Sequence, residues 1–420
     1  MLAAVCWPAA AADASWIQRY AEESPLARRD CEAKQFDACR ERLKSLLGLL
    51  DGRVDIVYRL AKVEASAGDP AAALRWLGTF SRMGLPLVDP AADPDFAALR
   101  DHPQFAEVLA RLRAAREPVS HSRPFLTLPA SDLVAEDIAY DPVGDRFYIS
   151  SVRHREIVSL TRAGAAADFL REGTAGVWAM LALGIDAKRR ILWATTAAMP
   201  EALGYRAEDR GRSALLKYDL RSGALVKRYD APRDGEHVLG DLTVAPNGDV
   251  FVSDGHGPVY WVDHRGDRLE ELIPAGVFRS PQTPALTPDR RRLLVPDFTR
   301  GISVVDLKTR QTWLMSHPSD LSLGGIDGMY LAGRSLVAIQ NGTSPARVIR
   351  MRLNSSLEAI ESWETLEANW DGLDPTHGAL ATGKLYFIAN SGWDRLADDG
   401  SPKPGAVFTA PTIRELADFR

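Results

Sequence analysis

Two different periods of hydrophobic and polar positions divide the chain. Between residues 15 and 118, apolar side chains recur at spacings of three and four, and β-branched residues are few, which predicts helices. From Arg123 onward, short stretches of alternating apolar and polar residues are separated by turn sequences such as Pro-Asn-Gly, which predicts strands. The pattern therefore predicts a mainly β protein with an α-helical domain at residues 15–118 and a β domain at residues 119–420.

The clearest helical unit is residues 57–85, which contain two apolar stripes at helical spacing. Gly68 is expected to end the first helix, Asp69 to cap the second, and Pro70 to occupy its first turn. This unit resembles a tetratricopeptide repeat in the residues Leu60–Ala61, Gly68–Asp69 and Ala73–Leu74. Residues 95–112 predict a closing helix pair. Because such pairs need neighbours to bury their faces, we expect them to pack on the β domain, and the resemblance also implies a protein partner.

In the β domain one unit recurs six times: an apolar strand, a turn, a second apolar strand, and a small or polar residue at its end. The units begin at residues 136, 181, 240, 282, 327 and 376, and each is followed by a third strand, the last of which is predicted at residues 406–410. Six units of about four strands predict a six-bladed β-propeller. The apolar stretch 124–129 has no partner beside the first unit. We expect it to close the ring as the outer strand of the last blade, which would remove an exposed edge.

The first strand of each propeller blade lines the central channel, so repeat-equivalent residues form rings at one depth. The first ring is Glu136, Leu181, Gly240 with Asp241 beside it, Gln282, Asp327 and Thr376; the second, at the ends of the second strands, is Ser150, Thr195, Asp254, Asp297, Asn341 and Asn390. Carboxylate and amide oxygens that converge on one channel mouth predict a site for a hard divalent cation, calcium before magnesium. In the alternative interpretation, Glu136 and Asp327 only cap turns or accept backbone N–H groups.

The β domain resembles the gluconolactonase/regucalcin family of six-bladed propellers. The similarity lies in "AEDIAYDPVGDRFYISS", "GDLTVAPNGDVFVSDG", "SPQTPALTPDRRRLLVPD" and "GIDGMYLAG". It implies one divalent metal held by a glutamate, two asparagines and an aspartate. Glu136 matches the glutamate and Asp327 the aspartate, whereas the asparagine positions fall on Gly240 and Gln282. Gly240 offers no side-chain ligand, so Asp241 would have to replace it.

The same resemblance implies metal-assisted hydrolysis of a lactone or an ester. Asp327 would be both ligand and base, or Asp241 would be the base, and His256 is a third candidate. The predicted site has catalytic residues Asp327, Asp241 and His256, metal ligands Glu136, Gln282, Asp327 and Asp241, and substrate-pocket residues Asp254, Asp297, Asn341, Asn390, Thr376 and His377. The alternative is a non-catalytic propeller that binds a ligand or a protein partner and whose metal site is structural or degenerate. The missing asparagine and the added helices favour that alternative, whereas the intact Glu136 and Asp327 favour the hydrolase.

Composition limits the partners and the compartment. A net charge of −5 argues against nucleic acids and anionic membranes as partners, and no apolar run reaches the roughly 18 residues of a membrane span. Residues 1–14 are apolar and rich in alanine, like the end of a secretory signal, although a positive region is missing. We therefore expect a periplasmic or secreted protein, and otherwise a cytoplasmic one. Cys31 and Cys39 are then either a disulfide pair or two free thiols.

Overall fold

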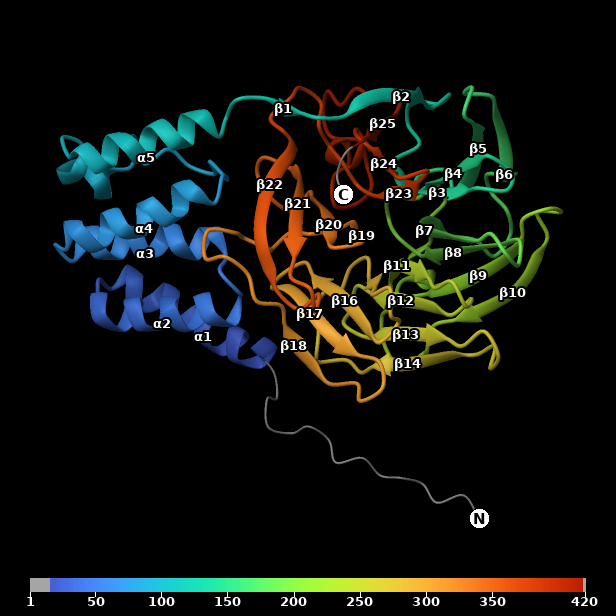
Figure 1. Cartoon of the computed structure of the whole chain (residues 1–420), viewed down its shortest axis with the longest axis horizontal. Coiled ribbons are helices and arrows are strands. Elements are labelled where there is room, and N and C mark those ends of the chain that lie inside the picture. Colours follow the sequence, from blue (N-terminus) through green and yellow to red (C-terminus); the bar gives the residue numbers. More distant parts are fainter. Residues whose placement is uncertain (1–15, 418–420) are drawn as a thin grey trace, which may run out of the picture.

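The computed structural model describes residues 16–417, so the predicted signal segment at residues 1–14 lies outside the described residues. The N-terminal helices are α1 (Trp16–Glu32), α2 (Phe36–Leu49), α3 (Val54–Ser66), α4 (Pro70–Arg82), the 3₁₀ helix η1 (Pro94–Leu99) and α5 (Pro103–Ala114). They stack on one another at one side of the strands (Figure 1). Cys31 and Cys39 form a disulfide that joins the end of α1 to α2.

The sequence signals around α4 act as predicted. Gly68 adopts a left-handed conformation with φ of 83° after α3, the Asp69 carboxylate accepts the N–H of Ala72, and Pro70 is the first residue of α4. The predicted closing helix pair at residues 95–112 is only half correct. Its second half is α5, but its first half is the six-residue 3₁₀ helix η1. The resemblance of these helices to tetratricopeptide repeats stays a prediction.

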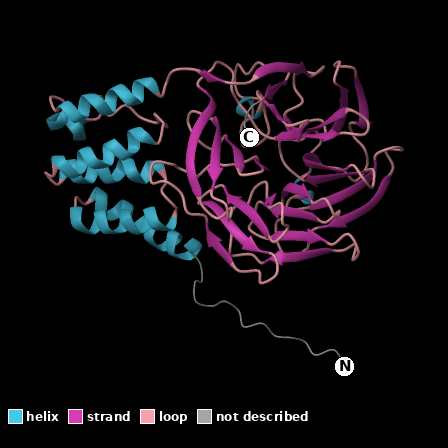
Figure 2. Ribbon diagram, viewed as in Figure 1, coloured by secondary structure: helices cyan, strands magenta, loops and turns pink. Residues whose placement is uncertain are grey.

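The rest of the chain is a six-bladed β-propeller, as predicted (Figure 2). Blade 1 contains β3 (Ala135–Asp141), β4 (Arg146–Ser151), β5 (Glu156–Thr161) and β6 (Ala166–Leu170), and blade 2 contains β7 (Ala179–Asp186), β8 (Ile191–Ala197), β9 (Ser213–Asp219) and β10 (Leu225–Asp230). Blade 3 contains β11 (Leu239–Val244), β12 (Val250–Asp254), β13 (Val259–Val262) and β14 (Leu269–Ile273), and blade 4 contains β15 (Ala285–Leu286), β16 (Arg292–Asp297), β17 (Gly301–Asp306) and β18 (Thr312–Leu314). Blade 5 contains β19 (Met329–Ala332), β20 (Ser335–Gln340), β21 (Arg347–Leu353), β22 (Ile360–Ala368) and the short β1 (Val119–Ser120), and blade 6 contains β23 (Gly378–Ala381), β24 (Lys384–Ile388), β25 (Thr412–Leu416) and β2 (Arg123–Thr127).

The ring closes as predicted, because β2 pairs antiparallel with β25 and becomes the outer strand of the last blade. The prediction of the third strand in that blade was wrong. Residues 406–410 form no strand, and Val407 among them is 69% exposed. The third strand is β25, which buries Ile413 and Leu416 instead.

The core lies between neighbouring blades, whose facing strands bury apolar side chains against each other. Ala139 and Tyr148 of blade 1, for example, pack in one cluster with Leu183 and Leu192 of blade 2. The helices attach to the propeller through polar contacts as well: the Trp16 indole donates to the carbonyl of Val277. No helix among the described residues is long and apolar enough to cross a membrane.

Candidate active site

Irregular pairing at the start of the first strands brings consecutive residues into the channel. The register shifts between Ala135 and Ile138 in blade 1, and between Leu239 and Asp241 in blade 3. A bulge of this kind re-aims side chains that strict alternation would send to opposite faces. In blade 1 the hydroxyl of Ser150 accepts the N–H of Asp137, at 2.9 Å. The Thr195 hydroxyl accepts the equivalent N–H in blade 2, so these hydroxyls of the second predicted ring stabilise backbone.

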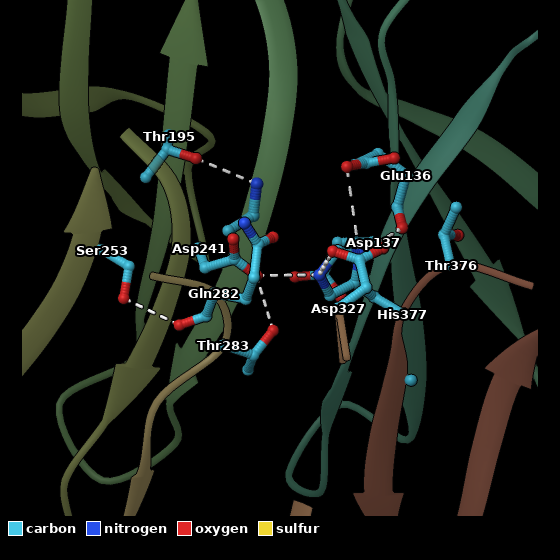
Figure 3. A network of polar contacts seen from close by, with 12 residues as sticks. Glu136, Asp137, Thr195, Asp241, Ser253, Gln282, Thr283, Asp327, Thr376 and His377 are labelled. Atoms are coloured by element: carbon cyan, nitrogen blue, oxygen red, sulfur yellow. Dashed lines mark hydrogen bonds and ion pairs between the residues drawn. The ribbon is translucent and has the colours of Figure 1, made fainter. Parts of the chain in front are cut away.

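The polar cluster of the channel therefore includes the residues one position after the predicted first ring. Those equivalents are Asp137, Ala182, Asp241, Thr283, Gly328 and His377, and four of them are polar. Figure 3 shows Asp137, Asp241, Thr283 and His377 converging with Glu136 and Asp327. The prediction missed Asp137 and Thr283 and placed His377 only in a substrate pocket.

His377 is the centre of the cluster and is only 2% exposed. Its Nε2 lies 2.8 Å from Asp241 Oδ1 and 3.5 Å from Asp327 Oδ1. Its Nδ1 lies 3.1 Å from the backbone carbonyl oxygen of Glu136 and 4.0 Å from that residue's carboxylate. Because both ring nitrogens face acceptors, the doubly protonated imidazolium satisfies both. Burial opposes this charge, but the neighbouring carboxylates prevail and raise the pKa of His377 well above its usual value.

Asp327 is held by side chains, and so is Glu136. The amide of Asn341 donates to Asp327 Oδ2 at 2.5 Å, and the Trp393 indole donates to the Glu136 carboxylate. Neither carboxylate accepts a backbone N–H among the described residues, so neither caps a turn there. Asp254 and Asp297, by contrast, accept backbone N–H groups of turns.

Two glycines allow the approach of Asn341 to Asp327. Gly325 has φ of 75°, and a side chain on it would meet the backbone of Gly342 at 2.7 Å. A side chain on Gly342 would in turn collide with Phe298 and with Gly325. The stretch "GGID" thus brings the Asp327 loop against the end of β20.

Four carboxyl groups lie around the imidazole of His377 in this cluster, and burial makes the ionised form of Glu136, Asp137 and Asp327 costly. Burial, reinforced by negative neighbours, raises the pKa of Glu136 and of Asp327, although His377 opposes the shift. Burial likewise raises the pKa of Asp137 to about 7. A buried group of acids in excess of its cations keeps some protons or recruits a cation.

The donor atoms fit a divalent metal. One atom each from Asp241, Asp327 and His377 lies within 4.8 Å of the other two. Bonds of roughly 2.0–2.6 Å place opposite ligands of one ion about 4–5 Å apart, so these three side chains can share an ion. The two asparagine positions of the resembled family contribute differently. Gly240 has no side chain. The side chain of Gln282 is already held, because its amide nitrogen donates to Ser280.

Comparison with known proteins gives no family. No protein-family model matches the sequence, and no curated protein does so either. Among solved structures, a gluconolactonase from Xanthomonas campestris is similar at 14% identity and a TM-score of 0.47, over 72% of this chain and 99% of that one. A chain of the nidogen/laminin complex is similar at 14% identity and a TM-score of 0.42, over 55% and 80% of the two chains. Neither similarity identifies a function.

The cluster opens into a cavity of about 270 Å³ at one mouth of the channel. Its lining residues are Glu136, Phe298, Asp327, Asn341, Asp374, Thr376 and Trp393. A second cavity, of about 370 Å³, enters the channel along the inner strands and reaches Thr283 and Tyr330. The Thr283 hydroxyl donates to Asp241 Oδ1, so the cluster lies between the two cavities.

The other predicted site residues lie apart from this cluster. Asp254 is buried against the imidazole of His237, Asp297 holds a turn, and Asn390 binds the backbone of Thr412. Asn390 lines a separate cavity of about 500 Å³, which shares Asp374 with the channel mouth. The His256 side chain is exposed and makes no hydrogen bond among the described residues. Roles for these residues in catalysis or substrate binding stay predictions.

Proposed function

We propose that the chain hydrolyses a lactone or an ester in the channel-mouth cavity, with the help of a divalent metal ion. The observation that carries the proposal is the convergence of four carboxyl groups on His377 beneath that cavity. Among the described residues Glu136 and Asp327 hold no turn, whereas an ion or a substrate would use them. Perturbed carboxyl groups that line a cavity are typical of active sites.

Asp241, Asp327 and His377 would hold the ion, with Glu136 beside them. His377 would bind as the neutral imidazole, so binding of the ion would release the Nε2 proton that the metal-free imidazolium shares with Asp241. When bound, such an ion supplies a Lewis acid for the substrate carbonyl. The carboxylates suit calcium, the ion that we predict, while the imidazole nitrogen also admits manganese or zinc.

Asp327 would act as the general base. Its raised pKa lets it accept a proton near neutral pH, and Asn341 holds its Oδ2 so that Oδ1 faces the cluster. The oxygen of a water adds to the carbonyl carbon, the bond from that carbon to the alcohol oxygen breaks, and Asp327 passes the water's proton to that oxygen. A lactone then yields a hydroxy acid. The raised pKa of Glu136 favours a protonated carboxyl group, which can donate to the substrate carbonyl.

The test is metal-dependent stability and turnover of the wild type and of Asp327→Asn. We expect calcium or manganese to raise the melting temperature, because an ion at 100 times its Kd stabilises by about 2.7 kcal/mol. Gluconolactone or an aryl ester should be hydrolysed, and Asp327→Asn should lose both effects. Asp297→Asn is the matched control, since Asp297 is also buried but holds a turn outside the cluster.

The same measurements separate the alternative function. If a metal raises the melting temperature but no ester or lactone is hydrolysed, the result supports a non-catalytic propeller whose metal site is structural. If no metal raises the melting temperature and no substrate is hydrolysed, the metal-dependent hydrolase is contradicted.

We also propose that the protein is periplasmic or secreted. The Cys31–Cys39 disulfide supports this, because disulfides persist in oxidising compartments. Fractionation of cells that express the full chain, with thiol labelling of each fraction, tests it. A cytoplasmic protein with two reactive thiols would contradict the proposal. A protein partner of the helices remains a further prediction.

A further inference from the structure

Arg347 is a buried cation at the junction of the helices and blade 5. It is 1% exposed, and no ion pair joins it to an acid among the described residues. Its Nη1 donates to the carbonyl of Met83 at the end of α4, and its Nε donates to Gln340 Oε1 at 2.7 Å. Burial lowers the pKa of Arg347 to about 9. A buried charge without an ionic partner destabilises the fold, so we expect Arg347 to have a function that explains its presence.

Gln340 carries the connection from Arg347 toward the site. Its side-chain amide is fully buried, and its nitrogen donates to the carbonyls of Ser322 and Gly324, each at 2.9 Å. Gly324 lies three residues before Asp327. The residue after Gln340 is Asn341, which donates to the Asp327 carboxylate. One amide therefore fixes both segments that set the position of Asp327.

The helices touch the same loop at a second point. The turn between α2 and α3 places Asp51 Oδ1 3.1 Å from His317 Nε2, and the Arg53 side chain lies against Gly324. Figure 1 shows the α3–α4 pair beside β21 and β22 of blade 5. The loop that ends at Asp327 is thus supported by the helical region as well as by the propeller.

We propose that Gln340 and Arg347 are positioning residues of the channel site, and that the helical region, through the Met83 carbonyl, sets the geometry of Asp327. This inference rests on the proposed function where metal affinity is concerned. Residues behind metal ligands typically change metal affinity by about 10–100-fold when they are replaced. The helices would then be a working part of the site and not an independent appendage.

The experiment compares Gln340→Met and Arg347→Met with the wild type in the full chain. We expect the Kd for Mn²⁺, measured by electron paramagnetic resonance, to rise at least about tenfold in both. Arg347→Lys keeps a cationic donor for Gln340 and should restore most of the affinity. Arg190→Met is the matched control: it breaks the partly buried Arg190–Asp141 pair at the far end of β3 and should lower stability while leaving the Kd within twofold.

Hydrogen exchange separates failure of this inference from failure of the proposed function. In the metal-free protein, the amides of Gly325 and Asp327 donate to Phe298 and Ile339, and Gln340→Met should speed their exchange at least about tenfold. If the wild type binds no Mn²⁺, the proposed function fails and exchange alone decides the positioning. If Gln340→Met folds with unchanged Kd and unchanged exchange, the inference is wrong. Should Gln340→Met not fold, Arg347→Lys and Arg347→Met decide it by the same two readouts.

Discussion

Replacement of His377 by asparagine tests the electrostatics of the cluster directly. The imidazolium contacts Asp241 at 2.8 Å in a buried pair, and the Glu136 carbonyl at 3.1 Å in a partly buried one. Asparagine cannot carry the positive charge, so within residues 16–417 Asp241 keeps only the Thr283 hydroxyl as a polar side-chain partner. Removal of one member of a buried ion pair costs about 3–5 kcal/mol.

The expected change in melting temperature follows from the size of the propeller. Its roughly 300 residues correspond to an unfolding entropy of about 0.6 kcal/mol/K, so the loss lowers the melting temperature of the metal-free protein by about 5–8 °C. The assay is thermal unfolding with a chelator present, at pH values from 6 to 9.

The pH dependence has a definite sign. The pKa of His377 is raised in the folded protein, so its stabilisation is fully present below the unfolded pKa of about 6.5 and is lost as pH rises through the folded value. The difference between wild type and His377→Asn should therefore be largest near pH 6 and shrink at alkaline pH. His237→Asn, which removes a second buried histidine bound to Asp254, is a control that should leave the response to Mn²⁺ unchanged. Equal stability of His377→Asn and the wild type at pH 6 would refute a buried cation at the centre of the cluster.

Two further predictions concern the joints of the fold. Lys384, Tyr386 and Arg123 overcome burial and lower the pKa of Glu415 to about 2, so its stabilisation is present above pH 4.5 and is lost as pH falls toward 2. Glu415→Gln should lower the free energy of unfolding, measured with urea, by on the order of 2 kcal/mol at pH 7 and by almost nothing near pH 2. Equal losses of this free energy at both pH values would contradict the prediction. Burial lowers the pKa of His317, but Asp51 outweighs this effect and raises it. The contact between His317 and Asp51 therefore stabilises the fold below pH 6.5, and this stabilisation is lost as pH rises through the raised pKa of His317. Proteolysis of the segment 115–118 should therefore be faster in His317→Asn than in wild type at pH 6, and a rate unchanged by the substitution would show that this contact does not hold the helices.

The blade count and the ring closure were predictable because their signals are local. Alternating apolar residues and turn sequences recur in each unit, and the unpaired stretch 124–129 needed a partner. The last blade was less readable, since residues 389–411 form a long connection whose apolar residues 406–410 imitate a strand. The real strand β25 has only Ile413 and Leu416 as its buried apolar residues, too few to stand out.

The positions of the site residues were predictable only to within one residue, because the backbone pairing is irregular at the start of the first strands. Strict alternation sends Glu136 and Asp137 to opposite faces, and the irregular pairing that brings both to the channel depends on contacts that no short stretch of sequence encodes. A signal was present, however, because Asp137, Asp241, Thr283 and His377 keep the same repeat spacing as the predicted ring. Carboxylates at two consecutive ring positions would have indicated that both rings face the axis.

The buried acids outside this cluster differ from Glu136 and Asp327 in the groups that they bind. Asp254 and Asp297 occupy equivalent positions on the second strands, and their carboxylates accept backbone N–H groups, which explains them without any ligand. Among the described residues Asp327 and Glu136 accept only side-chain donors, and burial raises the pKa of both. A propeller can fill its channel with apolar side chains at no such cost, so the retention of these acids around His377 favours a bound cation or a reacting substrate over a structural role.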